Sequence, residues 1–197
     1  MIGIGDNVVD DYTNIRTVFP GGNALNFSVY ASMLGCEAAY LGVFGTDRAA
    51  EHVRKTADEL GIDTSHCKAA DGLNGHAELA LENGERIFLR SNEGGIAKSV
   101  PLDFVFDDID YLESFALMHT SAYSYIDSYH ERLGSFGCPL SYDFSDDFDA
   151  DAALSSWESW AAIAARLRAA AGPTSSSMSA VPGSRPRAPG SSSGTRN

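Results

Sequence analysis

Two glycines that precede a predicted helix form the segment of this sequence best suited to binding a small molecule. Gly21 and Gly22 come just before a helix predicted over residues 24–34, and Asn26 falls in its first turn. Glycines let the backbone approach a ligand closely, and a helix start offers unpaired N–H groups. The Asn26 amide donates and accepts, which suits the hydroxyls of a neutral polyol. A tight turn followed by a helix start is the alternative interpretation.

Asp10 is the second candidate, because it follows the first predicted strand, residues 1–5, by five positions. A carboxylate can accept hydrogen bonds from two adjacent sugar hydroxyls, although an isolated aspartate here is also typical of a cap or a surface charge. Asp6 follows Gly3 and Gly5 inside the strand and its turn, so we assign it to the turn. Position 8 is Val, so a dinucleotide fingerprint is incomplete, and a Walker A motif is absent. The histidines and cysteines show no metal-binding spacing, so we predict no metal site.

The elements that must position these residues alternate between strands and helices, which predicts an α/β domain with a mostly parallel sheet. The turn at residues 82–84 lies between two of the strands and predicts a hairpin that projects as a smaller sheet. A sharp turn is predicted at residues 20–22. Strands are predicted at 1–5, 12–19, 38–44, 76–81, 85–90, 115–120 and 140–144, and helices at 24–34, 47–60 and 126–133, the second capped by Asp47.

Composition limits the classes of function. The net charge of −13 argues against nucleic-acid binding. The sequence has no apolar run long enough to cross a membrane, and its three scattered cysteines are typical of a reducing compartment. We therefore expect a cytoplasmic protein with no nucleic-acid or membrane partner.

The composition changes abruptly near residue 150, where Ser, Ala, Gly, Pro and Arg become dominant. Residues 150–172 have the spacing of an amphipathic helix, and residues 173–197 are predicted to be disordered because they can bury little apolar surface. This bias is typical of a coding sequence read in a wrong frame, so a frameshift near residue 150 is one hypothesis. A natural low-complexity tail is the other.

The spacing over residues 21–45 resembles the first signature of the ribokinase/PfkB carbohydrate kinases. The matching positions are Gly21, Gly22, Ala24, Asn26, Ser28, Gly35 and Gly45. Residues 5–10, 40–45 and 91–95 are most similar to the fructoselysine 6-kinase branch of that family. The resemblance covers residues 1–149 only.

This resemblance implies an α/β Rossmann-like ribokinase fold with a small β lid, and transfer of the γ-phosphate of ATP, with Mg²⁺, to a sugar hydroxyl. It implies that the sugar site is formed by Asp10, Gly21, Gly22 and Asn26. It also implies that Arg90 and Asn92, and less directly Tyr123, contact the amino-acid part of a glycated substrate. Lids of this family often form dimers, so a dimer through the lid is a further expectation.

The Gly-Ala-Gly-Asp motif of the family, whose aspartate is the general base, is absent from the 197 residues, as is the nucleotide-binding region around it. We therefore assign no catalytic residue. We expect residues 1–149 to be the front part of a kinase domain, incomplete and inactive as this chain. A sugar-binding module without catalysis, and an interaction protein that acts through the lid, are the alternatives.

Overall fold

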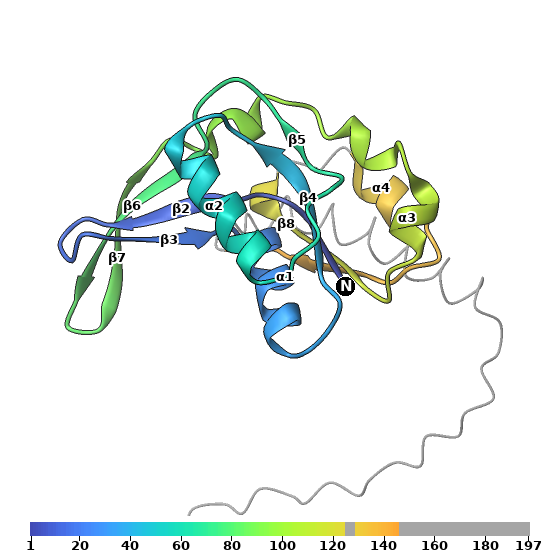
Figure 1. Cartoon of the computed structure of the whole chain (residues 1–197), viewed down its shortest axis with the longest axis horizontal. Coiled ribbons are helices and arrows are strands. Elements are labelled where there is room, and N and C mark those ends of the chain that lie inside the picture. Colours follow the sequence, from blue (N-terminus) through green and yellow to red (C-terminus); the bar gives the residue numbers. More distant parts are fainter. Residues whose placement is uncertain (125–128, 146–197) are drawn as a thin grey trace, which may run out of the picture.

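A five-stranded parallel sheet forms the core of the fold (Figure 1). The computed structural model describes residues 1–124 and 129–145, so the helix predicted at 150–172 and the tail predicted at 173–197 lie outside the described residues. The strand order is β5-β4-β1-β8-β9. The bounds are β1 Ile2–Gly5, β4 Ala39–Phe44, β5 Lys68–Ala69, β8 Met118–Ser121 and β9 Leu140–Asp143.

Helices cover both faces of this sheet, as the continuous burial of β1 and β4 requires. On one face, α1 (Asn23–Met33) and α2 (Arg48–Glu59) pack against the sheet. The other face is covered by short helices, which are η1 Gly95–Lys98, η2 Asp103–Phe106, α3 Ile109–Glu113 and α4 His130–Leu133. One further short helix, η3 (Ala122–Ser124), follows β8.

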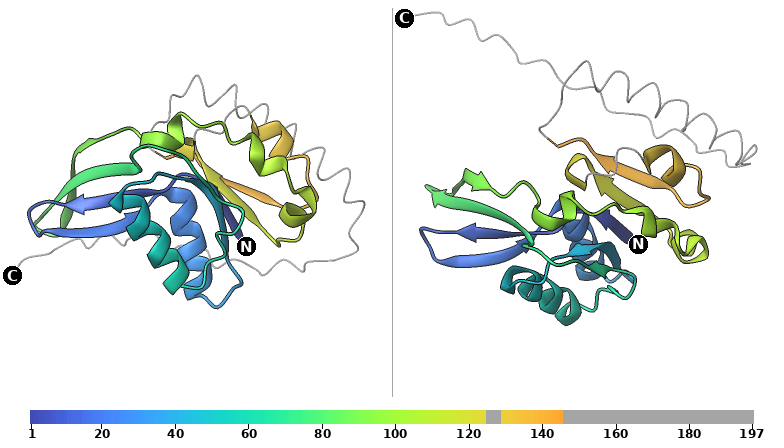
Figure 2. Two further views of the ribbon diagram at one scale, coloured as in Figure 1. Left: turned by 45° about the horizontal axis from the view of Figure 1, so that its top comes forward. Right: turned by 90° about the horizontal axis from the view of Figure 1, so that it is seen from above.

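A second sheet of four strands projects from the core, as Figure 2 shows. Its order is β3-β2-β6-β7, with bounds β2 Val8–Tyr12, β3 Thr17–Gly21, β6 Gly75–Glu82 and β7 Glu85–Ser91. Strands β2 and β6 are parallel, and the two outer pairs are antiparallel hairpins. We call this the lid sheet. It confirms the predicted α/β class with a smaller sheet, and the predicted hairpin at residues 82–84.

Two local predictions are wrong. Residues 12–19 are not one strand, because a turn over residues 13–16 separates β2 from β3, with Arg16 at a φ of 53°. The sharp turn predicted at residues 20–22 is also shifted, since Pro20 and Gly21 belong to β3. Pro20 is tolerated because β3 is an edge strand, where a missing N–H breaks no pairing on the outer side. Of the helix predicted at 126–133, α4 is the part that the structure describes as α-helix.

The buried carboxylate of Asp6 fixes the start of α1 to the core sheet. Its Oδ2 accepts the N–H of Asn23 at 2.7 Å, and its Oδ1 accepts the N–H of Ala24 at 3.0 Å. The hydroxyls of Ser121, at the end of β8, and Ser124, in η3, donate to the same Oδ1 at 3.2 and 2.9 Å. Because the group is only 7% exposed, these donors replace the water that a carboxylate otherwise needs.

Helix α1 also lies unusually close to β1. A Cβ atom on Gly3 would fall 1.9 Å from the carbonyl oxygen of Ala24 and 2.7 Å from Ser28 Oγ. Ser28 Oγ accepts the Gly3 N–H at 3.1 Å and donates to the Ala39 carbonyl at 2.6 Å. Helix α1, β1 and β4 are therefore joined by one buried hydroxyl that only a glycine at position 3 leaves room for.

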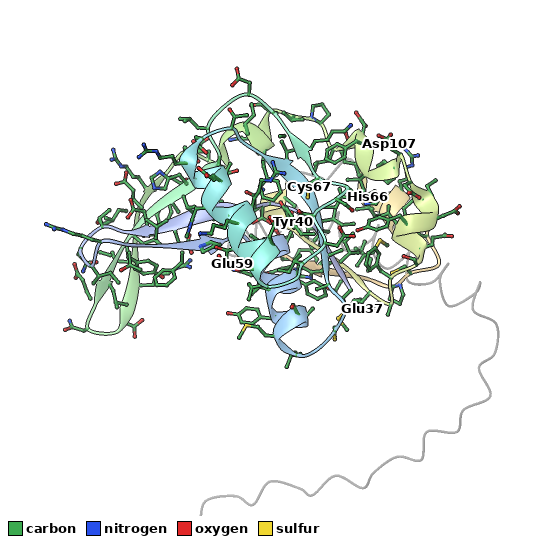
Figure 3. The ribbon with its side chains drawn as sticks, viewed as in Figure 1. Glu37, Tyr40, Glu59, His66, Cys67 and Asp107 are labelled. Atoms are coloured by element: carbon green, nitrogen blue, oxygen red, sulfur yellow. The ribbon has the colours of Figure 1, made fainter. Side chains whose placement is uncertain are left out.

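Tyr40 occupies the interior on the α1 and α2 side of the sheet (Figure 3). Its hydroxyl donates to the Gly5 carbonyl at 2.6 Å and accepts from Asn7 Nδ2 at 2.8 Å. The Cys67 thiol donates to the Tyr40 carbonyl at 3.1 Å, and burial raises the pKa of Cys67 to about 12. This thiol therefore stays protonated at neutral pH and packs as an apolar group.

Replacing Gly3 by alanine tests the contact between α1 and β1. The added methyl forces the two elements apart, so Gly3→Ala is expected to lower the free energy of unfolding by about 2 kcal/mol or more. Gly137→Ala is the matched control, because no atom lies within 4 Å of the site a Cβ would take there. Chemical denaturation of both variants measures the difference. Equal stabilities would contradict the close approach.

The Asp6 cap is tested by Asp6→Asn, which keeps the shape but points an amide group at backbone N–H donors. We expect the free energy of unfolding to fall by about 3 kcal/mol, since buried donors lose a charged acceptor. Asp58→Asn, at an exposed site near the end of α2, is the control and should change stability by less than about 0.5 kcal/mol. Urea titration decides, and a loss no larger than that of the control would show that the cap is dispensable.

Candidate functional site

Four of the predicted site residues lie near the junction between the lid sheet and the start of α1. Asp10 lies in β2, two positions after the strand begins, while Gly21 ends β3 and Gly22 caps α1. The structure brings Asp10 and Gly21 together, because a Cβ on Gly21 would lie 3.0 Å from Asp10 Oδ2. A glycine at position 21 thus leaves the space in front of this carboxylate open.

Gly22 is required by the backbone itself. Its φ is 107°, a conformation that side-chain-bearing residues rarely adopt. A Cβ there would also lie 2.7 Å from the Cα of Asn7. The second glycine therefore allows the loop to pass tightly over the segment that connects β1 to β2, in addition to any role toward a ligand.

Asn26 lies one turn into α1 and is half-buried. Its backbone N–H donates to the Gly22 carbonyl at 2.8 Å. Its side-chain amide makes no hydrogen bond to any other residue within 1–124 and 129–145. Both the donor and the acceptor of this amide are thus free to meet a polar ligand, as far as the described residues determine.

The expectation that the start of α1 offers unpaired N–H groups is wrong. The N–H groups of Asn23 and Ala24 donate to the Asp6 carboxylate, and that of Leu25 donates to the Asp6 carbonyl at 3.4 Å. Asp6, which the sequence assigns to a turn, supplies a negative charge where the positive end of the helix dipole lies. This helix start is therefore a capped end and does not attract an anion.

The Asp10 carboxylate is half-buried and only loosely paired. Its Oδ2 lies 3.8 Å from Nη1 of Arg86, beyond hydrogen-bond distance, and its side chain is 21% exposed. Burial raises the pKa of Asp10 above its ordinary value, and the charge of Arg86 acts in the opposite direction. Its oxygens accept no hydrogen bond from the described residues. They are accordingly available to hydroxyl donors.

Arg90 is placed away from Asp10. Its Nη2 donates to Glu78 Oε1 at 2.7 Å, and the strand register sets Glu78 beside Asp11 of β2. Because side chains alternate along a strand, Arg90 lies on the lid face opposite Asp10. Arg86 is the arginine that reaches Asp10. The sequence missed it because an irregularity between Glu78 and Leu79 shifts the hairpin register, and residue counting cannot reveal such a bulge.

Asn92 lies at the end of the lid hairpin, and both polar atoms of its side-chain amide are hydrogen-bonded. Its Oδ1 accepts the His76 N–H at 2.8 Å, and its Nδ2 donates to the Asn74 carbonyl at 2.7 Å. Asn74 in turn accepts the Gly45 N–H at 3.1 Å, so these asparagines connect the lid to the end of β4. Tyr123, in η3, is 40% exposed.

The end of β9 adds polar groups that sequence reasoning missed. Asn23 Nδ2 donates to Asp143 Oδ2 at 3.2 Å and to Ser145 Oγ at 2.8 Å, which joins this strand end to the start of α1. The sequence could have indicated Asp143, because it ends the strand β9 and ligands of open parallel sheets bind at the carboxyl ends of the strands. Next to it, His119 stacks on Phe27 with ring centroids 4.6 Å apart, and burial lowers the pKa of His119.

The starts of the two long helices are both capped by an aspartate carboxylate, so neither is suited to the phosphates of a nucleotide. Phosphate sites use free N–H groups at a helix start, and an aspartate carboxylate already accepts from such groups at both helices. Asp47 Oδ1 accepts the Ala50 N–H at 2.9 Å at the start of α2, as Asp6 does at α1. Within residues 1–124 and 129–145, no group of three or more His, Cys, Asp or Glu could hold a metal ion. Among the helices of those residues, none has both the length and the apolar character that a bilayer crossing requires.

Known proteins match this chain over the same region. The profile of the pfkB family carbohydrate kinases matches residues 7–134. The fructosamine kinase FrlD of Bacillus subtilis (strain 168) is 40% identical over 152 residues, which are 77% of this chain and 53% of that protein. The fructoselysine 6-kinase of Escherichia coli (strain K12) is 28% identical over 148 residues, 74% of this chain and 55% of that protein. The chain spans about half the length of these relatives.

Solved structures agree in fold. A fructokinase from Xylella fastidiosa superposes with a TM-score of 0.62 at 16% identity, covering 76% of this chain and 53% of that one. An uncharacterized sugar kinase from Pyrococcus horikoshii in complex with ATP gives a TM-score of 0.61 at 15% identity, covering 75% and 53%. The predicted ribokinase-like fold is thereby confirmed. With its profile match and its fold in agreement, this chain belongs to the pfkB family of carbohydrate kinases.

Proposed function

We propose that this chain binds the sugar part of a glycated amino acid at Asp10, Gly21, Gly22 and Asn26, and that it is the sugar-binding part of an ATP-dependent fructosamine or fructoselysine kinase. The observation that carries the proposal is the half-buried Asp10 carboxylate, which accepts no hydrogen bond from the described residues and faces the space left by Gly21. The names of the relatives supply the class of sugar.

The donors and acceptors suit a neutral polyol. The Asp10 carboxylate accepts from two adjacent hydroxyls, while the Asn26 amide donates to one oxygen and accepts from another. The capped start of α1 offers nothing to a phosphate. A sugar that binds as the unphosphorylated substrate therefore fits this junction better than a sugar phosphate does.

Phosphoryl transfer requires more than this site provides. A base must reach the attacking hydroxyl, and positive charge or N–H donors must stabilise the transferred phosphoryl group. The 197 residues contain no Gly-Ala-Gly-Asp motif, which the family resemblance implies for both tasks. We infer that the binding of ATP and Mg²⁺ for phosphoryl transfer requires residues that are not among these 197. The chain alone then binds the sugar without phosphorylating it.

Calorimetry on the purified chain tests this function. Fructoselysine is expected to bind, and Asp10→Asn and Asn26→Ala are each expected to weaken binding by about tenfold or more, because each removes a hydrogen-bonding group from a half-buried site. Asp11→Asn is the matched control, since Asp11 lies on the other lid face beside His76. Affinity should also decline as the pH falls through the raised pKa of Asp10, because protonation removes an acceptor.

Two results would contradict the proposal. Absence of binding by a chain whose folding is verified by circular dichroism would exclude the sugar site. Formation of phosphorylated fructoselysine from ATP, followed by mass spectrometry, would exclude the inference that the chain is inactive alone.

A second candidate function is self-association through the lid. Half of the large hydrophobic side chains that are exposed among the described residues lie on the lid sheet or its turns, namely Ile15, Val18, Phe19, Leu81, Ile87, Phe88 and Leu89. Val18 and Ile87 lie on the lid face opposite Asp10. Exposed apolar side chains on such a face are typical of surfaces that a partner covers. We propose a second copy of the chain as that partner.

Sedimentation velocity tests the dimer. The wild-type chain should sediment as a dimer, and Leu89→Ser, which alters a side chain 50% exposed on β7, should shift it toward the monomer. Tyr30→Ser changes a residue 63% exposed on α1, away from the lid, and should leave the dimer intact. A wild-type monomer at every concentration measured would exclude the lid as a dimer surface.

A further inference from the structure

Arg86 presents a loosely paired guanidinium beside the candidate sugar site. Its Nη1 lies 3.8 Å from Asp10 Oδ2, and the side chain is 63% exposed. It makes no hydrogen bond to the residues that the structure describes. Arg90, four positions along the same strand, differs sharply, because it donates to Glu78 at 2.7 Å and that contact raises its pKa. Arg90 of β7 is thus held by a hydrogen-bonded ion pair, whereas Arg86 forms only a longer ion pair without a hydrogen bond.

The surroundings of Arg86 are apolar as well as charged. The register places Phe19 of β3 and Ala77 of β6 on either side of Asp10. Two positions further along β6, Leu79 lies opposite Phe88 of β7. Since alternate residues of a strand share a face, Asp10, Phe19 and Phe88 are on one face of the lid sheet. Phe19 is 49% and Phe88 is 59% exposed, so apolar surface lies next to the carboxylate.

We propose that Arg86 binds the carboxylate of the amino-acid part of the substrate, and thereby selects glycated amino acids over simple sugars. This inference rests on the proposed function, in which the sugar lies against Asp10. A glycated amino acid adds an aliphatic part and a carboxylate to the sugar. The exposed rings of Phe19 and Phe88 suit the aliphatic part, and a planar guanidinium binds a carboxylate through two parallel N–H donors.

The negative net charge of the chain favours a dedicated cationic side chain at a site that binds a carboxylate. With a net charge of −13, the protein repels anions in general, so a substrate carboxylate needs a local positive group. Arg90 is already neutralised by Glu78 on the other face of the lid. Among the described residues, Arg86 forms an ion pair only with Asp10, at a distance too long for a hydrogen bond. Its five N–H donors can therefore bind a second carboxylate.

A different role for Arg86 makes a different prediction. If its charge served only to keep Asp10 ionised, its loss would weaken every sugar equally. If it contacts the substrate carboxylate, its loss weakens only ligands that carry one. The ratio of affinities for matched ligands with and without the carboxylate separates the two roles, as in a double-mutant cycle.

The experiment measures binding of four probes to the full chain by calorimetry. The probes are fructoselysine, its α-carboxamide, fructosylglycine and fructosylglycinamide, so that each pair differs only in the charge of one group. We expect at least one carboxylate to bind about tenfold better than its amide. Arg86→Gln should reduce that preference to less than about twofold, Arg86→Lys should retain part of it, and Arg90→Gln should leave it unchanged.

The outcomes distinguish this inference from the function on which it rests. If the wild-type chain binds none of the four probes, the proposed function fails. If it binds them but shows no preference for either carboxylate, or if Arg86→Gln weakens acid and amide equally, the assignment of Arg86 is overturned and the sugar site stands. Loss of the preference in Arg90→Gln would also overturn it.

Discussion

The Asp6 carboxylate joins three parts of the chain, namely the end of β1, the start of α1 and the end of β8. Removing a carboxylate from water costs several kcal/mol unless donors replace the water. Two backbone N–H groups and two serine hydroxyls do so here. Each donor comes from an element whose end lies at the same edge of the core sheet. The position of Gly22, and with it that of Asn26 one turn along α1, therefore depends on this one buried charge.

The lid sheet depends on that edge as well. It leaves the core through the segment that contains Asn7 and returns through Gly22, and Asn74 ties its second hairpin to Gly45. The two faces of the lid then differ in electrostatic character. One carries the closed Glu78–Arg90 pair. The other carries the looser Asp10–Arg86 pair beside exposed aromatic rings, and this difference gives the lid one face with unused hydrogen-bonding capacity.

Much of the fold could be predicted from the sequence because its signals are local. The alternation of apolar strands with helices, Asp47 as a cap and the hairpin around Asn83 all depend on neighbouring residues, and the structure contains each of them. The prediction of one strand over residues 12–19 failed because the turn that divides them and the edge strands of the lid are both partly polar, so composition does not distinguish them. The spacing around Gly21 also indicated the family, which the profile match confirms.

The candidate site could be predicted only in part, because side-chain partners depend on register and on distant segments. The role of Asp6 requires Ser121 and Ser124, which no local pattern connects to it. Arg86, and not Arg90, lies beside Asp10 because a bulge shifts the register of the hairpin. Counting residues along the hairpin cannot detect this bulge. Asp143 could have been predicted as a site residue, because ligands of open parallel sheets bind at the carboxyl ends of the strands.

The partners of Asp6 also define an order of assembly. Asn23 and Ala24 lie 17 and 18 positions away along the chain, whereas Ser121 and Ser124 lie 115 and 118 positions away. Contacts between distant residues form slowly because loop closure costs entropy before the contact stabilises anything. During synthesis, α1 can be capped soon after it emerges, but the carboxylate keeps part of its water until β8 has been made. The candidate site at this junction therefore gains its complete support only after β8 and η3 have been made.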